Sequence, residues 1–96
     1  MSYLSEFPDY DDNLYIPEGW EDNSWHNNLC PHAEKWNASE TVRVMLWQDY
    51  KDVNKREYDN GKRYTLEIDI DHDAVFLFGT DDFELIKEMA KGVDLR

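Results

Sequence analysis

The chain has 96 residues, which is the length of one domain, so a two-domain enzyme, a TIM barrel and a complete dinucleotide-binding fold are excluded. Asp and Glu number 22 against 10 Lys and Arg, and the resulting formal net charge of −12 disfavours nucleic acid and anionic membranes and favours basic proteins as partners. With 41% hydrophobic residues, including four Trp, six Tyr and four Phe, we expect a folded domain despite a mean hydropathy of −0.87.

Residues 1–40 carry a net charge of −8 and show little hydrophobic periodicity. Turn-forming Asp, Asn, Pro and Gly residues alternate there with aromatic ones, which predicts loops held against the folded surface. One short helix is predicted over residues 31–37. Pro31 suits its first turn, because N–H groups in the first turn of a helix have no hydrogen-bond partner within the helix and the missing one is not needed.

Residues 41–48 are predicted to form a strand. Their side chains alternate between two faces that are both apolar enough for a central or covered position. One face would carry Val42, Val44 and Leu46, and the other would carry Arg43, Met45 and Trp47.

The Asn60-Gly61 pair predicts a type I′ hairpin turn, because both central residues of that turn need a positive φ. The turn would join a strand over residues 54–59 to a strand over residues 64–70. In the second strand we expect Tyr64, Leu66, Ile68 and Ile70 to point inward and Thr65, Glu67 and Asp69 to point outward. Residues 71–73 are predicted to form a turn, and residues 74–78 a short apolar strand.

The clearest helix is predicted over residues 81–91, with Thr80 or Asp81 as its N-cap and Gly92 as its stop. Asp81 and Glu84 have the spacing of a capping box. The predicted fold is therefore α+β, a single domain over residues 1–96. An antiparallel meander of three to five strands would carry the C-terminal helix on one face, after an aromatic-rich, loop-dominated N-terminal region. The predicted inward set is Val42, Val44, Leu46, Leu66, Ile68, Ile70, Val75, Leu77, Phe83, Ile86, Met89 and Ala90.

Two groups of acidic residues are candidates for partner binding. The first occupies alternate positions about 7 Å apart, a spacing comparable with that of phosphates along a nucleic-acid strand. It consists of Glu67, Asp69, Asp71 and Asp73, extended by Asp81 and Asp82. The second group lies among aromatic residues, which together with carboxylates suit Arg and Lys through ion pairs and cation–π contacts. It contains Asp9, Asp11, Asp12, Glu18, Trp20, Glu21, Asp22 and Trp25.

Two arrangements could in principle hold a metal ion, and neither is complete. Asp69, Asp71 and Asp73 have the spacing that opens a calcium loop, but the later positions that need Gly and Glu hold other residues. The second set, for zinc, is His26, Cys30 and His32, and no second Cys exists to complete a structural site. We therefore predict no cofactor. No nucleophile motif and no Gly-rich phosphate loop occurs, so an enzyme is not expected.

The single Cys30 excludes an intramolecular disulfide. The first residues lack the basic region and apolar run of a secretory signal, and no segment approaches the roughly 20 apolar residues of a membrane helix. These features predict a cytoplasmic protein.

In size, acidity and α+β make-up the chain resembles the small inhibitors that phages and other mobile elements use against host nucleases, including anti-restriction and anti-CRISPR proteins. Some of these inhibitors are DNA mimics. The resemblance rests on composition and implies a protein–protein interaction in the host cytoplasm, in which the chain covers a basic nucleic-acid-binding protein or nuclease complex. One alternative is an immunity protein or antitoxin that neutralises a basic toxin. Another, of a different class, is a small metal-binding protein or metal-dependent enzyme.

Overall fold

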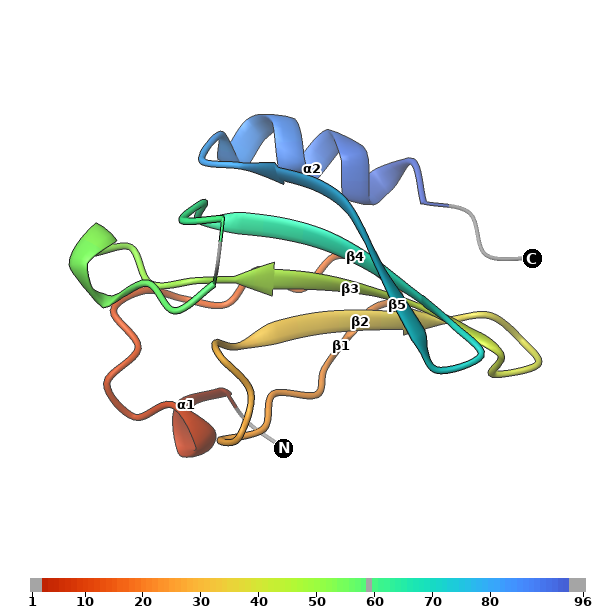
Figure 1. Cartoon of the computed structure of the whole chain (residues 1–96), viewed down its shortest axis with the longest axis horizontal. Helices are drawn as coiled ribbons and strands as arrows, with labels where there is room; N and C mark the ends of the chain where they lie inside the picture. Colours follow the sequence, from red (N-terminus) through yellow and green to blue (C-terminus); the bar gives the residue numbers. More distant parts are fainter. Residues whose placement is uncertain (1–2, 59, 94–96) are drawn as a thin grey trace.

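Five antiparallel strands and one packed helix form the protein (Figure 1), as seen in a computed structural model that describes residues 3–58 and 60–93. The strands follow one another in the sheet in chain order, so the sheet is a meander and the predicted α+β class is confirmed. The strands are β1 (Glu21–Asp22), β2 (His32–Trp36), β3 (Val42–Gln48), β4 (Tyr64–Ile70) and β5 (Asp73–Thr80). The helices are α1 (Tyr3–Glu6), the 3₁₀ turn η1 (Val53–Lys55) and α2 (Phe83–Lys91).

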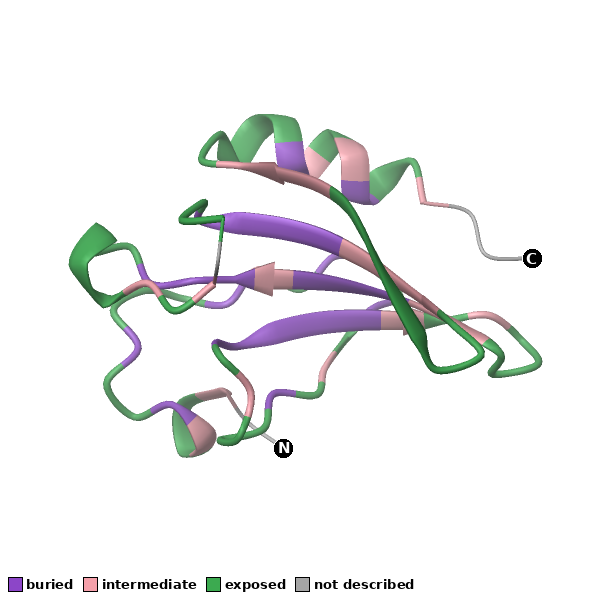
Figure 2. Ribbon diagram, in the orientation of Figure 1, coloured by how far each residue is buried: buried purple, intermediate pink, exposed green. Residues whose placement is uncertain are grey.

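The hydrophobic core lies between the sheet and α2. β3 is the central strand, as its two apolar faces predict, and it pairs with β2 on one side and β4 on the other. Figure 2 shows the middle strands buried along much of their length, with two buried positions on α2 facing them. The buried core residues are Trp20, Ala33, Val44, Leu46, Tyr64, Leu66, Ile86 and Ala90. Within the described part of the chain, no helix is long and apolar enough to cross a membrane.

The helix predicted over residues 31–37 is wrong, because this segment forms β2. Ala33 of β2 pairs with Asp22 of β1 on one side and with Leu46 of β3 on the other, so both edges of β2 are hydrogen-bonded to neighbouring strands. Pro31 lies just before the strand, and its carbonyl accepts a hydrogen bond from the Gln48 N–H at 2.9 Å. Pairing with two neighbours therefore overrides the local preference that Pro31 suggested.

The predicted strand over residues 54–59 is also wrong, although its last residue, Asp59, lies outside the described residues. Residues 53–55 form η1, and β4 pairs directly with β3. A type I′ turn needs a positive φ at both central residues and a strand on each side; Gly61 has a φ of 68°, but no strand of the described residues leads into it from η1, so it joins no hairpin. That conformation occurs instead at Asp71 and His72, whose φ values are 50° and 72° and which alone connect β4 to β5.

β5 lies at one edge of the sheet, and a β-bulge changes which of its residues point inward. Leu66 pairs with Phe78 and Glu67 with Phe76, so Leu77 is the extra residue. Val75 and Leu77, both predicted inward, are 50% and 51% exposed. Three further predictions fail: Ile70, at the end of β4, and Phe83, at the start of α2, are exposed, and Thr65 is buried, where its hydroxyl accepts a hydrogen bond from the Asn60 amide at 3.0 Å.

Helix α2 begins at Phe83, two residues later than predicted, and its N-cap is Asp82 in place of Thr80 or Asp81. The Asp82 carboxylate accepts a hydrogen bond from the Leu85 N–H at 3.2 Å. Asp81 is held elsewhere, since its carboxylate accepts from the Arg63 N–H at 2.8 Å and pairs with Arg56 at 3.0 Å. Gly92 ends the helix as predicted.

Replacing Asp82 with Ala should destabilise the protein by about 1 kcal/mol, because α2 then loses its N-terminal cap. Urea unfolding measures this difference. Glu88→Ala is the matched control, because Glu88 is exposed on the same helix and pairs only with Lys91. Equal losses for the two variants would contradict the assignment of the cap.

Candidate functional site

The face of the sheet that points away from α2 is built from polar and aromatic side chains, and we call it the polar face. Alternation along each strand places these residues together, because neighbouring positions in a strand point to opposite faces. The cross-strand register arranges nine of these residues in three rows, each with one residue from β2, one from β3 and one from β4. The rows are His32, Trp47 and Thr65; Glu34, Met45 and Glu67; and Trp36, Arg43 and Asp69. On β5, Ala74 and Phe76 complete the polar face.

Glu34 is the centre of a hydrogen-bond network on this face. Its carboxylate accepts from His32 Nε2 at 2.8 Å and from Trp36 Nε1 at 2.6 Å, and it lies 3.5 Å from the Arg43 guanidinium. Burial acts to raise the pKa of Glu34, but hydrogen bonds from His32, Trp36 and Asn23 outweigh it and hold the pKa below its usual value. Glu34 is therefore a buried carboxylate that stays ionised at neutral pH.

Arg43 connects this network to β4. Its guanidinium donates to Asp69 at 2.9 Å and lies 5.1 Å from the centre of the Trp36 ring. Nearby, the Tyr58 hydroxyl donates to Glu67. The single cation of the polar face is thus shared between two carboxylates, which leaves the face with a net negative charge.

Three hollows follow one another along the polar face. The central hollow has a volume of about 310 Å³ and lies between the loop containing Trp25 and the side chains of His32, Arg43, Trp47 and Asp69. A second hollow of about 370 Å³ shares Trp47 and Glu67 with it, so the two are neighbours.

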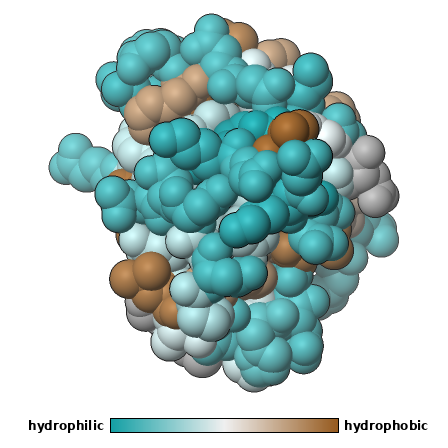
Figure 3. All heavy atoms as spheres, turned by 90° about the vertical axis from the view of Figure 1, so that its left-hand side faces the viewer, coloured by the Kyte–Doolittle hydropathy of each residue, from teal (hydrophilic) through white to brown (hydrophobic). Residues whose placement is uncertain are grey.

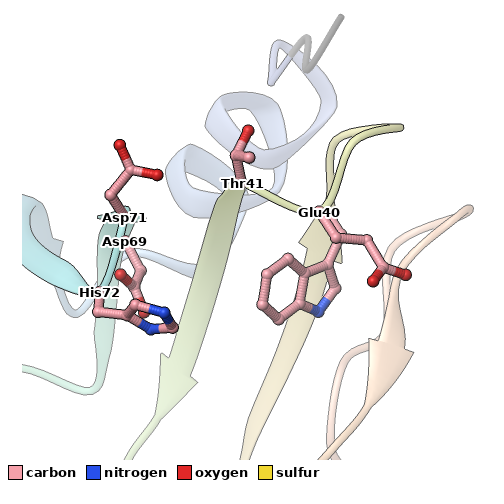
Figure 4. A pocket seen from close by; sticks show the side chains of 6 residues that line it. Glu40, Thr41, Asp69, Asp71 and His72 are labelled. Atoms are coloured by element: carbon pink, nitrogen blue, oxygen red, sulfur yellow. The ribbon is translucent and has the colours of Figure 1, made fainter.

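The third hollow has a volume of about 170 Å³ and shares Asp69 with the central hollow. It lies at the end of the sheet where β2 and β4 end and β3 begins. Figure 4 shows Asp69, Asp71 and His72 on one side of it and Glu40 on the other, with Thr41 between them. Acidic side chains therefore border the row of hollows at this end.

Four buried polar atoms of the described residues make no hydrogen bond, and all four belong to residues that line the central hollow. They are His32 Nδ1, Arg43 Nε, Trp47 Nε1 and Asp69 Oδ1. Buried polar groups in proteins are almost always hydrogen-bonded, so their gathering at one place distinguishes this hollow from the rest of the surface.

The row of carboxylates predicted from Glu67 to Asp73 is not continuous. Glu67 and Asp69 share the polar face, but the chain reverses at Asp71 and His72. Asp73 pairs with Ile70 and so points to the opposite face. Glu67 and Asp69 are partly buried, and each accepts a hydrogen bond, Glu67 from Tyr58 and Asp69 from Arg43. The expectation that both point outward to solvent is therefore corrected.

Most of the predicted N-terminal acids hold the N-terminal segment onto the domain. Asp9 accepts from the Tyr50 hydroxyl at 3.0 Å, and Asp22 accepts from the backbone N–H groups of Tyr3 and Ser24. Asp11 accepts from two backbone N–H groups, those of Lys51 and Asp52.

Asp12 pairs with Arg63 at 3.0 Å, and this hydrogen bond lowers the pKa of Asp12. Glu18 and Glu21 are exposed.

Figure 3 shows a largely hydrophilic surface, with a few separate hydrophobic patches, at the end of the molecule where η1 lies.

The four tryptophans divide between core and surface. Trp20 is buried against α2, so it offers a partner little surface. Trp25 is 42% exposed and Trp36 is 38% exposed, and both border the polar face, while Trp47 is half-buried within it. Of the two tryptophans predicted to bind a partner, Trp25 is therefore accessible and Trp20 is not, and Trp36 and Trp47 are also accessible in part.

The three residues considered as zinc ligands lie in different surroundings. His26 pairs with Glu6 at 3.0 Å, His32 is buried in β2, and Cys30 is buried with its thiol pKa raised by burial. Within residues 3–58 and 60–93, no three His, Cys, Asp or Glu side chains are placed so that they could hold a metal ion.

Sequence reasoning missed the residues of β2 that organise the polar face. The alternation of His32, Glu34 and Trp36 with Ala33 and Lys35 is the signal that could have found them. Comparisons of the chain with protein-family models, with curated proteins and with solved structures gave no match.

Proposed function

We propose that this protein is an acidic, protein-binding inhibitor that covers a basic nucleic-acid-binding surface of its partner. The observation that carries the proposal is the polar face, where two exposed indoles, Trp25 and Trp36, border a group of carboxylates that includes the ionised Glu34. Tryptophan is a frequent anchor of protein interfaces, and a carboxylate beside an indole suits an arginine or lysine. The net charge of −12 supports the same class of partner.

Acids that border the polar face would guide the first encounter. Asp71 and Glu40 are exposed and line the hollow at the strand ends. Such peripheral charges mainly increase the rate of association, whereas desolvated aromatic anchors set the rate of dissociation. The division between acids at the edge of the polar face and indoles beside its carboxylates fits this arrangement.

The broken carboxylate row favours covering the partner's surface over copying the regular phosphate spacing of DNA. The proposed partner is a host nuclease complex, as in anti-CRISPR or anti-restriction inhibition, and the site of action is then the host cytoplasm. An immunity protein that caps a basic toxin would use the same surface. The identity of the captured partner decides between the two.

The test begins with capture of salt-sensitive partners from a host lysate, followed by a competition assay with the purified partner and fluorescently labelled DNA or RNA. The inhibitor should displace the nucleic acid. Trp25→Ala should weaken this inhibition at least about thirtyfold, the effect of an anchor contributing about 2 kcal/mol.

Leu85→Ala is the matched control, because Leu85 is 43% exposed but lies on α2, away from the polar face. The control should inhibit as well as the unaltered protein. A partner that still binds its nucleic acid normally in the saturated complex would refute the proposed function.

A further inference from the structure

The central hollow presents a matched set of donors and acceptors. Arg43 Nε and Trp47 Nε1 each carry a hydrogen to donate, and Asp69 Oδ1 accepts. His32 Nε2 lies 2.8 Å from the carboxylate of Glu34, which can only accept, so Nε2 carries a hydrogen, and in the ring with that one hydrogen Nδ1 is an acceptor. All four atoms have almost no accessible surface, so a ligand in the hollow reaches them only when the side chains that line it move apart.

The charge around the hollow selects the sign of its ligand. Glu67 and Asp69 line it and Glu34 lies behind it, whereas Arg43 is the one cation among its lining residues. Because Arg43 is already paired with Asp69 and lies near Glu34, an anion would meet uncompensated carboxylates there. A cationic group is therefore favoured.

The shape and walls of the hollow narrow the choice of cation. Trp25 and Trp47 line it, and Trp47 lies against His32 with ring centres 4.3 Å apart. A guanidinium is planar, stacks on aromatic rings and directs several N–H donors at separate acceptors, whereas an ammonium is a compact, strongly hydrated charge. The two unused donors need acceptors as well, and the carbonyl groups of a peptide backbone provide them.

We propose that the central hollow binds an arginine side chain presented by the partner on an extended peptide segment. The guanidinium donates to Asp69 Oδ1 and His32 Nδ1, and backbone carbonyls of the same segment accept from Trp47 Nε1 and Arg43 Nε. This inference rests on the proposed function, because it names the group by which the basic partner is recognised.

The test is a titration of the ¹⁵N-labelled protein with the acetylated and amidated peptide Gly-Gly-Arg-Gly-Gly, followed by NMR. The protein has four Trp, so its indole N–H groups report separately on the core and on the polar face. The Trp47 indole signal should shift most and in a saturable way. Replacing the arginine with lysine, or with its neutral analogue citrulline, should weaken binding about tenfold or more, because lysine lacks the planar fork of donors and citrulline lacks the positive charge.

Two variants test the assignment of the hydrogen bonds. Asp69→Asn should abolish the preference for arginine over citrulline, and Trp47→Phe should weaken binding of the arginine peptide as followed by the Trp25 signal. Glu84→Gln, an exposed acid on α2, is the control for general charge and should change neither. Thermal unfolding checks that each variant is folded. If Asp69→Asn does not fold, Trp47→Phe with the three peptides decides the question.

Equal binding of the arginine, lysine and citrulline peptides, or shifts spread evenly over the acidic surface with Trp47 unmoved, would overturn the proposal. Tighter binding of inorganic phosphate than of the arginine peptide would overturn it too. Failure of the proposed function is a separate result: the arginine peptide then binds at Trp47, but no nucleic-acid-binding protein is inhibited. Conversely, a partner inhibited equally by the unaltered protein and by Trp47→Phe refutes the hollow alone.

Discussion

Raising the salt concentration from about 0.1 M to about 1 M should slow association with the proposed basic partner at least tenfold, because the Debye length falls from about 10 Å to about 3 Å. The attraction comes from the net charge of −12. Exposed acids such as Asp71 and Asp73 contribute to it fully, because no ion pair within the described residues neutralises their charge. The dissociation rate should change much less, because it depends on buried aromatic contacts. Stopped-flow measurement of Trp fluorescence separates the two rates.

A charge-reduced variant provides the control for this experiment. Asp71→Asn combined with Asp73→Asn leaves the polar-face network intact, and it should make the salt dependence of the association rate shallower. An association rate that does not change with salt would show that the acidity is a solubility trait. Function would then have to be sought in the aromatic side chains alone.

Asp49 should prove the most important acid for stability. It is 1% exposed, and its carboxylate accepts from the backbone N–H groups of Tyr50 at 2.8 Å, Glu57 at 3.0 Å and Tyr58 at 2.8 Å. These bonds close the loop that leads from β3 past η1 toward β4. Asp49→Ala should lower the free energy of unfolding by about 3 kcal/mol, because the loop loses its common acceptor.

Urea unfolding measures this loss, and two comparisons give it meaning. Glu18→Ala, at an exposed position, should stay within about 0.5 kcal/mol of the unaltered protein. Asp49→Asn should fall between the two, because the amide keeps one acceptor oxygen but loses the charge. An Asp49→Ala variant as stable as Glu18→Ala would contradict the role assigned to this carboxylate.

The parts of the fold that could be predicted from the sequence are those with a strong apolar period. β3, β4 and α2 each bury a face whose residues recur at the spacing of a strand or a helix, as Leu46, Leu66 and Ile86 do. β2 has no such signal, because the polar face places His32 and Glu34 at the positions where a strand normally shows apolar residues. The bulge in β5 and the loop closed by Asp49 depend on partners distant in the sequence, which no local pattern contains.

For the candidate site, composition predicted that acids and aromatics would matter but could not say which acids are free. Asp11 and Asp12 look equivalent in sequence to Glu18, yet the first two are held by internal hydrogen bonds. The difference arises when the N-terminal segment folds back against the segment after β3. Only the structure brings Arg43 between Glu34 and Asp69 and so creates the central hollow.

The edge strand β5 has a consequence for how copies of the chain behave toward one another. From Ala74 to Thr80 it carries no charge, and Val75, Phe76 and Leu77 are each about half exposed. An apolar strand at a sheet edge is a template for further strands, and natural proteins usually protect such edges with charges placed on them. Here the charges lie elsewhere on the surface and act at a distance, through mutual repulsion between molecules. Acidification to the isoelectric point, near pH 4.4, removes that repulsion while leaving the edge unchanged, so we expect edge-to-edge growth into extended sheets to compete with the folded, dispersed state near that pH.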